Sequence, residues 1–168
     1  GSHDGRVKVW DAATGKELAT LESQRGSIHF VAFLGSAERI LATCPGSRTV
    51  KIWNVNTKER IAINCDQSDL RGNIKPVAIF PDSQRVAISG LRDKTVQVFD
   101  TASGKLLHSL PGHTAQASPL VFSPVGQKLA TTTADGAVKV WDAVSGQQLL
   151  SLPTAASVTA VASVTTIP

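Results

Sequence analysis

Apolar and polar residues alternate in four segments of the chain that align with one another. Each segment places valine or isoleucine at every second position and ends on an aromatic residue followed by aspartate or asparagine. Such a period of two is typical of a β-strand with one buried face. The segments cover residues 4–11, 47–54, 93–100 and 135–142.

The aromatic residues that close these segments recur at spacings of 43, 46 and 42 residues. They are Trp10, Trp53, Phe99 and Trp141. A turn signal and another short apolar stretch follow each of them, which predicts a β-hairpin. The second strands of these hairpins are expected at residues 18–21, 60–63, 106–110 and 148–152.

A second pair of predicted strands precedes three of the four aromatic residues. The pairs lie at residues 28–33 and 40–43, 76–80 and 86–89, and 118–122 and 129–133. No stretch shows a sustained helical period. The sequence therefore predicts an all-β repeat chain with four short strands in each unit of 42–46 residues.

This repeat resembles the WD-repeat (Trp-Asp) β-propeller family. A period near 40–45 residues, with Gly-His upstream and Trp-Asp at the end of the third strand, is the pattern of that family. The fullest copy runs from Gly112-His113 through Asp135-Gly136 to Trp141-Asp142, and Asp11 and Asp100 recur at the position of Asp142. The resemblance implies a propeller whose blades each contain strands a to d.

The resemblance also implies a buried hydrogen-bond network in each complete blade. Its members here would be His113, Asp135, Trp141 and Thr131, or Thr133 on the same strand. A histidine between a carboxylate and a hydroxyl, ending at an indole donor, would pair every buried polar group. We expect this set to stabilise the fold rather than to act as a catalytic triad.

Two copies depart from the family pattern. The Trp53 copy has Ser47 in place of the turn aspartate and Asn54 after the tryptophan. The Phe99 copy keeps Asp93 and Ser89, but phenylalanine has no indole N–H. In both copies Gly-His is replaced, by Gly26-Ser27 and Gly72-Asn73.

The predicted units amount to about three and a half blades. Residues 1–22 supply strands c and d, residues 26–65, 73–110 and 113–152 are complete blades, and residues 154–168 form the first strand of a further blade. Propellers typically close with about 4–8 blades, and open strand edges favour aggregation. Either the chain is a segment of a larger propeller, which the absence of methionine favours, or separate chains complete one ring.

Charge and composition argue against several functional classes. The 17 basic and 13 acidic residues give a formal net charge of +4. Because the basic residues occur singly among acids, nucleic-acid binding is not expected. No leader peptide and no run of about 20 apolar residues is apparent, so we expect no membrane association and, by default, an intracellular location. The two cysteines and four histidines lack metal-ligand spacing.

The resemblance implies a protein-interaction scaffold without catalytic activity, cofactor or metal. No nucleophile elbow, phosphate-binding loop or His-Glu-x-x-His motif occurs in the sequence. The family position before the turn aspartate lies at one rim, where His3 and Arg92 are candidate partner-binding residues. The expected partners are other proteins, the remaining blades of the same propeller or a second copy of the chain. Two alternatives stay open: a self-assembling half-propeller, and the accessory propeller of an enzyme whose catalytic domain lies elsewhere.

Overall fold

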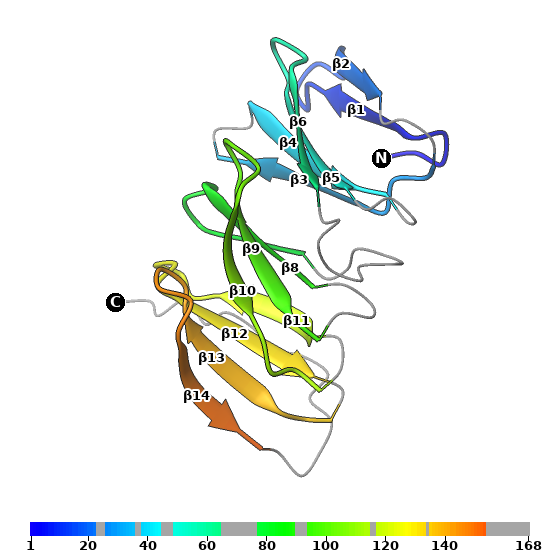
Figure 1. The fold of residues 1–168 in the computed structure, drawn as a ribbon. Helices are drawn as coiled ribbons and strands as arrows, with labels where there is room; N and C mark the ends of the chain where they lie inside the picture. The colour runs from blue at the N-terminus through cyan, green and yellow to red at the C-terminus, as the bar shows by residue number, and fades with distance from the viewer. Residues whose placement is uncertain are drawn as a thin grey trace.

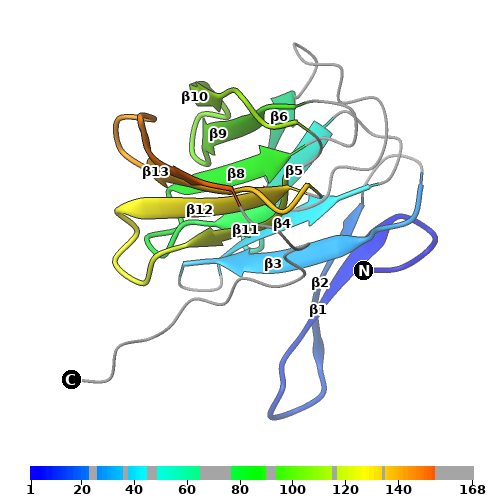
Figure 2. The ribbon, with the colours of Figure 1, turned by 90° about the horizontal axis from the view of Figure 1, so that it is seen from below.

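The chain folds into four antiparallel sheets stacked one after another (Figure 1). The computed structural model describes residues 1–22, 26–35, 38–44, 49–64, 77–89, 94–114, 117–133 and 135–153. These residues form fourteen strands, which confirms the predicted all-β class. In Figure 2 the strands of successive sheets overlap, because the view runs approximately along the stack.

Each sheet is a simple meander in which strands adjacent in sequence pair antiparallel. The first sheet contains β1 (Arg6–Trp10) and β2 (Glu17–Glu22). The second contains β3 (Phe30–Leu34), β4 (Arg39–Thr43), β5 (Thr49–Asn54) and β6 (Arg60–Asn64). The third contains β7 (Val77–Ile79), β8 (Arg85–Ser89), β9 (Val96–Asp100) and β10 (Leu106–Leu110). The fourth contains β11 (Ala117–Phe122), β12 (Lys128–Thr133), β13 (Val138–Asp142) and β14 (Gln148–Leu152).

The predicted strand at residues 28–33 begins two residues later, at Phe30. Ile28 and His29 make isolated backbone bonds instead: the Ile28 N–H donates to the Ser2 carbonyl at 3.0 Å, and the His29 N–H donates to the Thr43 carbonyl at 3.0 Å. The first of these bonds ties the second sheet to the segment before β1. The strand expected within residues 154–168 lies outside the described residues.

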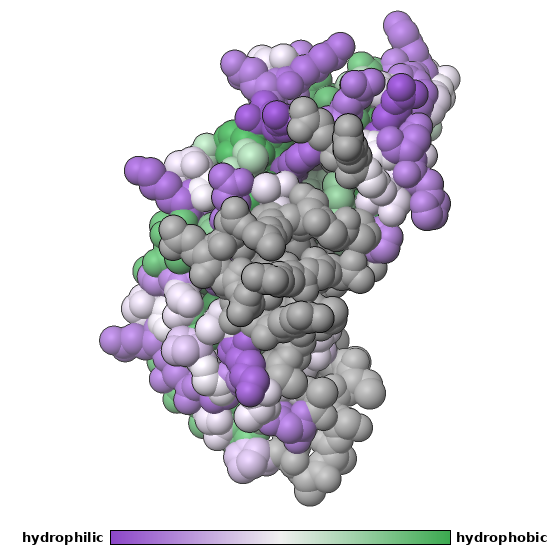
Figure 3. Space-filling view, turned by 45° about the vertical axis from the view of Figure 1, so that its right-hand side comes forward, coloured by the Kyte–Doolittle hydropathy of each residue, from purple (hydrophilic) through white to green (hydrophobic). Residues whose placement is uncertain are grey.

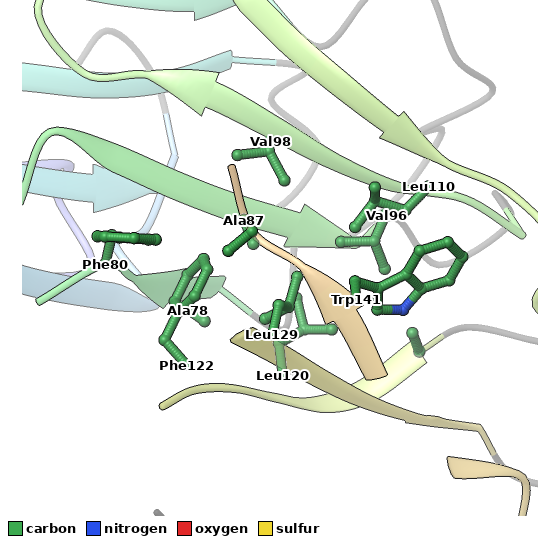
Figure 4. Packing of buried hydrophobic residues seen from close by; sticks show 12 residues of the cluster. Ala78, Phe80, Ala87, Val96, Val98, Leu110, Leu120, Phe122, Leu129 and Trp141 are labelled. Carbon is green, nitrogen blue, oxygen red and sulfur yellow. The ribbon is translucent and has the colours of Figure 1, made fainter. Parts of the chain in front are cut away.

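Apolar side chains hold neighbouring sheets together, because the inner sheets carry apolar residues on both faces. Three buried clusters result, each shared by two adjacent sheets. The first pairs Val7, Val9, Ala19 and Leu21 with Ile40, Ala42 and Trp53. The second pairs Leu34, Leu41, Val50, Ile52 and Ile63 with Val86, Ile88 and Phe99. The third joins sheets three and four, and Figure 4 shows Trp141 in it beside Val96 and Leu110.

Two arginines add polar contacts between neighbouring sheets. Arg39, at the start of β4, donates to the carbonyls of Ser83 and Thr101 in the third sheet, both at 3.3 Å. Arg85, at the start of β8, donates to the carbonyl of Ala143 in the fourth sheet at 2.8 Å. The registers Arg39↔Asn54 and Arg85↔Asp100 show that the two arginines occupy the same position in successive sheets.

Candidate functional site

The residue after each aromatic anchor caps the hairpin turn that follows it. Asp11 Oδ1 accepts the backbone N–H groups of Ala13 at 3.0 Å and Thr14 at 2.7 Å, and the Thr14 hydroxyl at 2.8 Å. The same carboxylate geometry recurs at Asp100 and Asp142. These side chains fix the exposed turns at one edge of the stack, as expected for Asx turns.

Asparagine performs the same function in the second sheet. Asn54 Oδ1 accepts the backbone N–H groups of Asn56 at 2.9 Å and Thr57 at 3.0 Å. The departure from Trp-Asp at Trp53-Asn54 therefore preserves the turn, because the cap needs an acceptor oxygen rather than a negative charge.

Hydrogen bonds to these carboxylates favour their ionised form. The backbone N–H of Thr14 is the main cause of the lowered pKa of Asp11, and the hydroxyl of Ser103 that of Asp100. The backbone N–H of Ser145 likewise lowers the pKa of Asp142. The three recurring acids are thus explained by turn geometry, because hydrogen bonds within each turn are the main cause of their lowered pKa.

Three of the four predicted network residues meet in the fourth sheet. The Trp141 indole N–H donates to the Thr131 hydroxyl at 3.0 Å, and His113 Nε2 lies 2.9 Å from the same oxygen. Thr131, Trp141 and His113 are all buried. The backbone N–H of His113 also donates to the Lys94 carbonyl at 3.2 Å, which attaches this histidine to the third sheet.

The fourth network residue, Asp135, does not join the other three. Its carboxylate accepts the hydroxyls of Thr114 and Thr133 and the backbone N–H of Ala137. His113 Nδ1, which was expected to face this carboxylate, has no hydrogen-bond partner among the described residues. Among the described residues, the Asp135 carboxylate and His113 Nδ1 make no hydrogen bond with each other.

The electrostatics of these two groups differ. Hydrogen bonds from the Thr114 hydroxyl, the Thr133 hydroxyl and the Ala137 N–H lower the pKa of Asp135 to about 2. Burial, reinforced by the positive charge of Lys139, lowers the pKa of His113 and keeps its ring neutral near pH 7. A neutral histidine beside a fully buried Thr131 hydroxyl holds the sheet together but offers a substrate no access to that hydroxyl.

Register shows why the hydroxyl-centred contact is confined to the fourth sheet. Thr131 pairs with Lys139, and the corresponding positions in the second and third sheets are Ala42 and Ile88. Ser89, predicted to fill this position, pairs with Val96 and lies one residue further along. Its hydroxyl is buried without a hydrogen-bond partner among the described residues.

One of the two predicted rim residues lies in the part of the chain that the structure describes. His3 is exposed in the turn that leads to Asp4. The Asp4 carboxylate accepts the backbone N–H of Arg6 at 3.0 Å, as Asp135 accepts that of Ala137. Arg92 lies outside the described residues. His3 is therefore the one rim candidate of the two that the structure places.

A groove between the second and third sheets was not predicted. It has a volume of about 530 Å³ and runs between β6 and the β9–β10 hairpin. Its lining combines amide, hydroxyl and apolar groups, from Ala62, Asn64, Gln97, Phe99, Ser103, Gly104 and Leu106. The sequence carries no signal for it, because the residues belong to two repeats and meet only through sheet packing.

In the described part of the chain, no three histidine, cysteine, aspartate or glutamate side chains gather closely enough to hold a metal ion. Within those same residues no helix has the length and apolar character needed to cross a bilayer. Cys44 is buried and forms no disulfide within the part of the chain that the structure describes, and Cys65 lies outside that part.

Comparison with known families identifies the repeat. A family model described as "WD domain, G-beta repeat" matches residues 15–54 and 104–142. Each matched stretch begins in the turn before the last strand of one sheet and ends just after the aromatic anchor of the next sheet. The sequence repeat is therefore offset from the sheet and extends across two adjacent sheets.

Several curated proteins are similar to the chain. It is 29% identical over 148 residues to nuclear distribution protein PAC1 of Arthroderma otae, covering 84% of this chain and 32% of the relative. It is 30% identical over 136 residues to WD repeat and SOCS box-containing protein 1 of Danio rerio, covering 80% of this chain and 32% of the relative. It is 31% identical over 138 residues to WD repeat-containing protein VIP3 of Arabidopsis thaliana, covering 76% and 43%. The chain thus spans about a third of the length of the first two relatives.

Proposed function

Because this chain belongs to the WD-repeat family, we propose that it is a non-catalytic platform for binding other proteins, built from about three and a half blades of a larger propeller. WD-repeat proteins bind other proteins and are generally non-catalytic. In this proposal the complete blades are residues 26–65, 73–110 and 113–152, and residues 154–168 begin a further one. The partners of the whole protein are part of the proposal, since the chain spans only a fraction of its relatives.

The observation that carries the proposal is the groove beside β6. Asn64 places an exposed amide group next to the exposed apolar side chain of Leu106. Amides both donate and accept hydrogen bonds, so this lining suits the backbone of an extended peptide together with one apolar side chain. The capped turn of Ser103 fixes one wall of the groove, which limits the conformational entropy lost on binding.

A second proposed contact region is the rim that precedes the turn aspartates. His3 is exposed there, and Arg92 belongs to it by its position in the repeat. Arginine is enriched among the residues that dominate binding energy. Figure 3 shows that hydrophilic residues cover much of the upper end of the molecule, where β1 and β2 lie. A polar surface of this kind suits a protein partner better than a membrane, and the interleaved charges argue against nucleic acid.

The proposal is tested by capturing partners with the tagged chain and measuring the bound amount by quantitative mass spectrometry. Arg92→Ala and Leu106→Asp are expected to reduce capture of a specific partner while leaving the thermal midpoint unchanged. Lys16→Ala is the matched control, because Lys16 is an exposed cation at the opposite, capped turns. Equal loss of capture and stability, or equal capture by all variants, would count against both surfaces.

The names of the relatives support the proposal of a binding platform whose partners differ from one protein to another. One relative is named for nuclear distribution and another for a SOCS box next to its WD repeats. The same repeats thus occur in proteins with different names and additional parts. The alternative in which this chain is the accessory propeller of an enzyme differs in one respect: catalytic activity would then belong to a domain outside these repeats.

A further inference from the structure

The groove between β6 and the β9–β10 hairpin has a counterpart on the other side of β6. This second groove lies between β2 and the β5–β6 hairpin and has a volume of about 390 Å³; its lining residues are Thr20, Leu21, Glu22, Trp53, Lys58 and Arg60. In Figure 1, β6 lies between β2 and the β9–β10 hairpin, so the two grooves follow one another along the stack. We call the groove beside β2 the basic groove and the groove beside the β9–β10 hairpin the neutral groove.

The two grooves are built from the same positions of the repeat. Arg60 pairs with the anchor Trp53 in the second sheet, as Leu106 pairs with the anchor Phe99 in the third. Strand register and turn hydrogen bonds match five lining residues in this way: Thr20 with Ala62, Glu22 with Asn64, Trp53 with Phe99, Lys58 with Gly104, and Arg60 with Leu106. The geometry of the groove is therefore repeated, whereas its chemistry changes.

Lys58 stands at a position where the other three hairpin turns have glycine. Its φ is 60°, and the equivalent glycines Gly15, Gly104 and Gly146 have φ values of 69°, 71° and 73°. A residue with a Cβ is strained in this left-handed region, whereas glycine is not. A strained residue in a turn that the chain elsewhere builds without strain indicates a function for its side chain. Here that side chain lines the basic groove.

Arg60 stands where the first sheet has an acid that pairs with a lysine. Glu17 accepts a hydrogen bond from Lys8 Nζ at 2.6 Å. Arg60 occupies the position of Glu17, since each pairs with the aromatic anchor of its sheet, and Lys51 occupies the position of Lys8. Burial is the main cause of the lowered pKa of Lys51, and the positive charge of Arg60 contributes to it. The second sheet thus places like charges where the first sheet places opposite ones.

The basic groove carries positive charge that its own lining does not neutralise. Lys58 and Arg60 are exposed, and neither side chain forms an ion pair with another residue in the described part of the chain. Glu22, the acidic residue of the lining, is paired with Arg6, whose Nε lies 3.6 Å from its carboxylate. A guanidinium and an ammonium in one groove suit a carboxylate ligand, which the guanidinium can bind through two hydrogen bonds.

We propose that the two grooves together bind one extended segment of a partner protein, with an acidic side chain in the basic groove and an apolar side chain in the neutral groove. This inference rests on the proposed function and names the chemistry that the binding platform selects. Arg60 and Ala62 are both exposed and lie two positions apart on β6, so the grooves meet over this strand. Packed sheets lie about 10 Å apart and an extended chain advances about 3.3 Å per residue, so the two anchoring side chains are at least about three positions apart.

The test selects ligands for the immobilised 168-residue chain from a random peptide library displayed on phage. Peptides of about twelve residues span about 40 Å when extended, which is enough to cross both grooves. The selected peptides are expected to share an acidic residue and an apolar residue at a fixed separation of about three positions or more. The dissociation constant of one selected peptide is then measured for each variant by fluorescence anisotropy.

Lys58→Gly separates binding from stability. It restores the glycine of the other turns, so the thermal midpoint should stay the same or rise, whereas the dissociation constant of the peptide should rise roughly tenfold. Arg60→Gln removes the other cation and should weaken binding by a similar factor. A peptide in which glutamine replaces the acidic residue should bind the unchanged chain and the Lys58→Gly variant equally, because both partners of the contact are then absent.

Lys16→Ala is the matched control for the loss of a cation. Lys16 is exposed in the equivalent turn of the first sheet, next to Gly15, and it lines neither groove. The control should leave the dissociation constant of the peptide unchanged. A decrease in affinity equal to that of Lys58→Gly would show that the chain attracts the peptide through its overall charge, which would overturn the proposal.

The selection and the variants also separate this proposal from the proposed function. Failure to select any peptide, or selected peptides without a shared acidic residue, would overturn the two-groove proposal. So would full affinity in both Lys58→Gly and Arg60→Gln. If Leu106→Asp alone weakened binding, the neutral groove would remain a binding site and only the basic groove would be removed. Capture of partners by the Leu106→Asp variant tests the proposed function whatever the selection yields.

Discussion

Trp141 and Thr131 are joined by a hydrogen bond of 3.0 Å inside the fourth sheet, and neither side chain reaches solvent. The hydroxyl that accepts the indole N–H also contacts His113, so one oxygen links β12, β13 and the segment before β11. Its removal would leave buried donors and acceptors without partners, which costs more than the hydrogen bonds themselves contribute.

Thr131→Val, which keeps the shape of the side chain, is therefore expected to lower the free energy of unfolding by about 1–3 kcal/mol. Urea denaturation followed by tryptophan fluorescence measures the change. Thr20→Val removes only a surface hydrogen bond, from the Thr20 hydroxyl to the Glu17 carboxylate in β2; it is the control and should shift stability by no more than about 0.5 kcal/mol. Equal effects of the two substitutions would show that the Thr131 hydroxyl contributes nothing specific.

The two inter-sheet arginines should differ in their contributions. Arg85 donates to the Ala143 carbonyl at 2.8 Å and stacks over the Phe80 ring, 3.7 Å from its centroid, whereas the contacts of Arg39 are all at 3.3 Å. Arg85→Met should cost about 2–3 kcal/mol, and Arg39→Met about 1 kcal/mol. Chemical denaturation of both variants tests this order, and a larger effect at Arg39 would contradict it.

Two glycine positions allow the free-energy cost of backbone strain to be measured separately from that of steric overlap. Gly126 and Gly15 have similar positive φ values of 71° and 69°. A Cβ at Gly126 would lie 2.3 Å from the Phe80 ring, whereas a Cβ at Gly15 would have no neighbour within 4 Å. Gly15→Ala is expected to cost about 1–2 kcal/mol for the left-handed backbone alone, and Gly126→Ala about 2–5 kcal/mol. Thermal unfolding of both variants gives the comparison, and equal costs would mean that Phe80 moves aside freely.

Acid stability should depend on the turn caps. The folded-state pKa values of Asp11, Asp100 and Asp142 are lowered from 3.8, and that of Asp135 is lowered to about 2. A carboxyl with a lowered folded-state pKa stabilises the fold fully above its unfolded-state pKa, and this contribution is lost as the pH falls toward the folded-state value. Stability is therefore expected to decrease between about pH 4 and pH 2.

The chain itself supplies the control for this effect, because Asn54 caps its turn without a charge. Changing Asp11, Asp100 and Asp142 together to asparagine should leave the fold intact at neutral pH and reduce the loss of stability in acid. Circular dichroism melts across this pH range measure both quantities. An unchanged acid profile would show that the caps are not the groups that titrate.

His113 adds a separate decrease in the free energy of unfolding below about pH 6.5, since its folded-state pKa is lowered and the unfolded chain binds the proton first.

The strands could be predicted because their signal is local and repeated. In Val96-Gln97-Val98-Phe99 the alternation alone identifies a strand, and three other copies in register exclude coincidence. The order of the strands in each sheet followed from short connections, which leave antiparallel neighbours as the simplest arrangement.

The polar contacts were harder to predict, because they depend on distances of a few ångströms between separate segments. Nothing in the sequence distinguishes an Asp135 that faces His113 from one whose oxygens are occupied by Thr114 and Thr133. Ser89 was placed in the network by residue type, and a register difference of one residue excludes it. The inter-sheet arginines could have been found in the sequence, because a basic residue recurs at the start of the second strand of each complete unit. These residues are Arg39, Arg85 and Lys128.

Each apolar cluster belongs to two adjacent sheets, and among the described residues no cluster reaches a third. The chain is therefore a one-dimensional array whose free energy of folding is a sum of unit terms and nearest-neighbour couplings. Within this array, the second and third sheets are each coupled on both sides. Because each sheet is coupled only to its neighbours, a whole unit can be duplicated or deleted without redesign of the others. The new junction between sheets is then of the same kind as the existing ones.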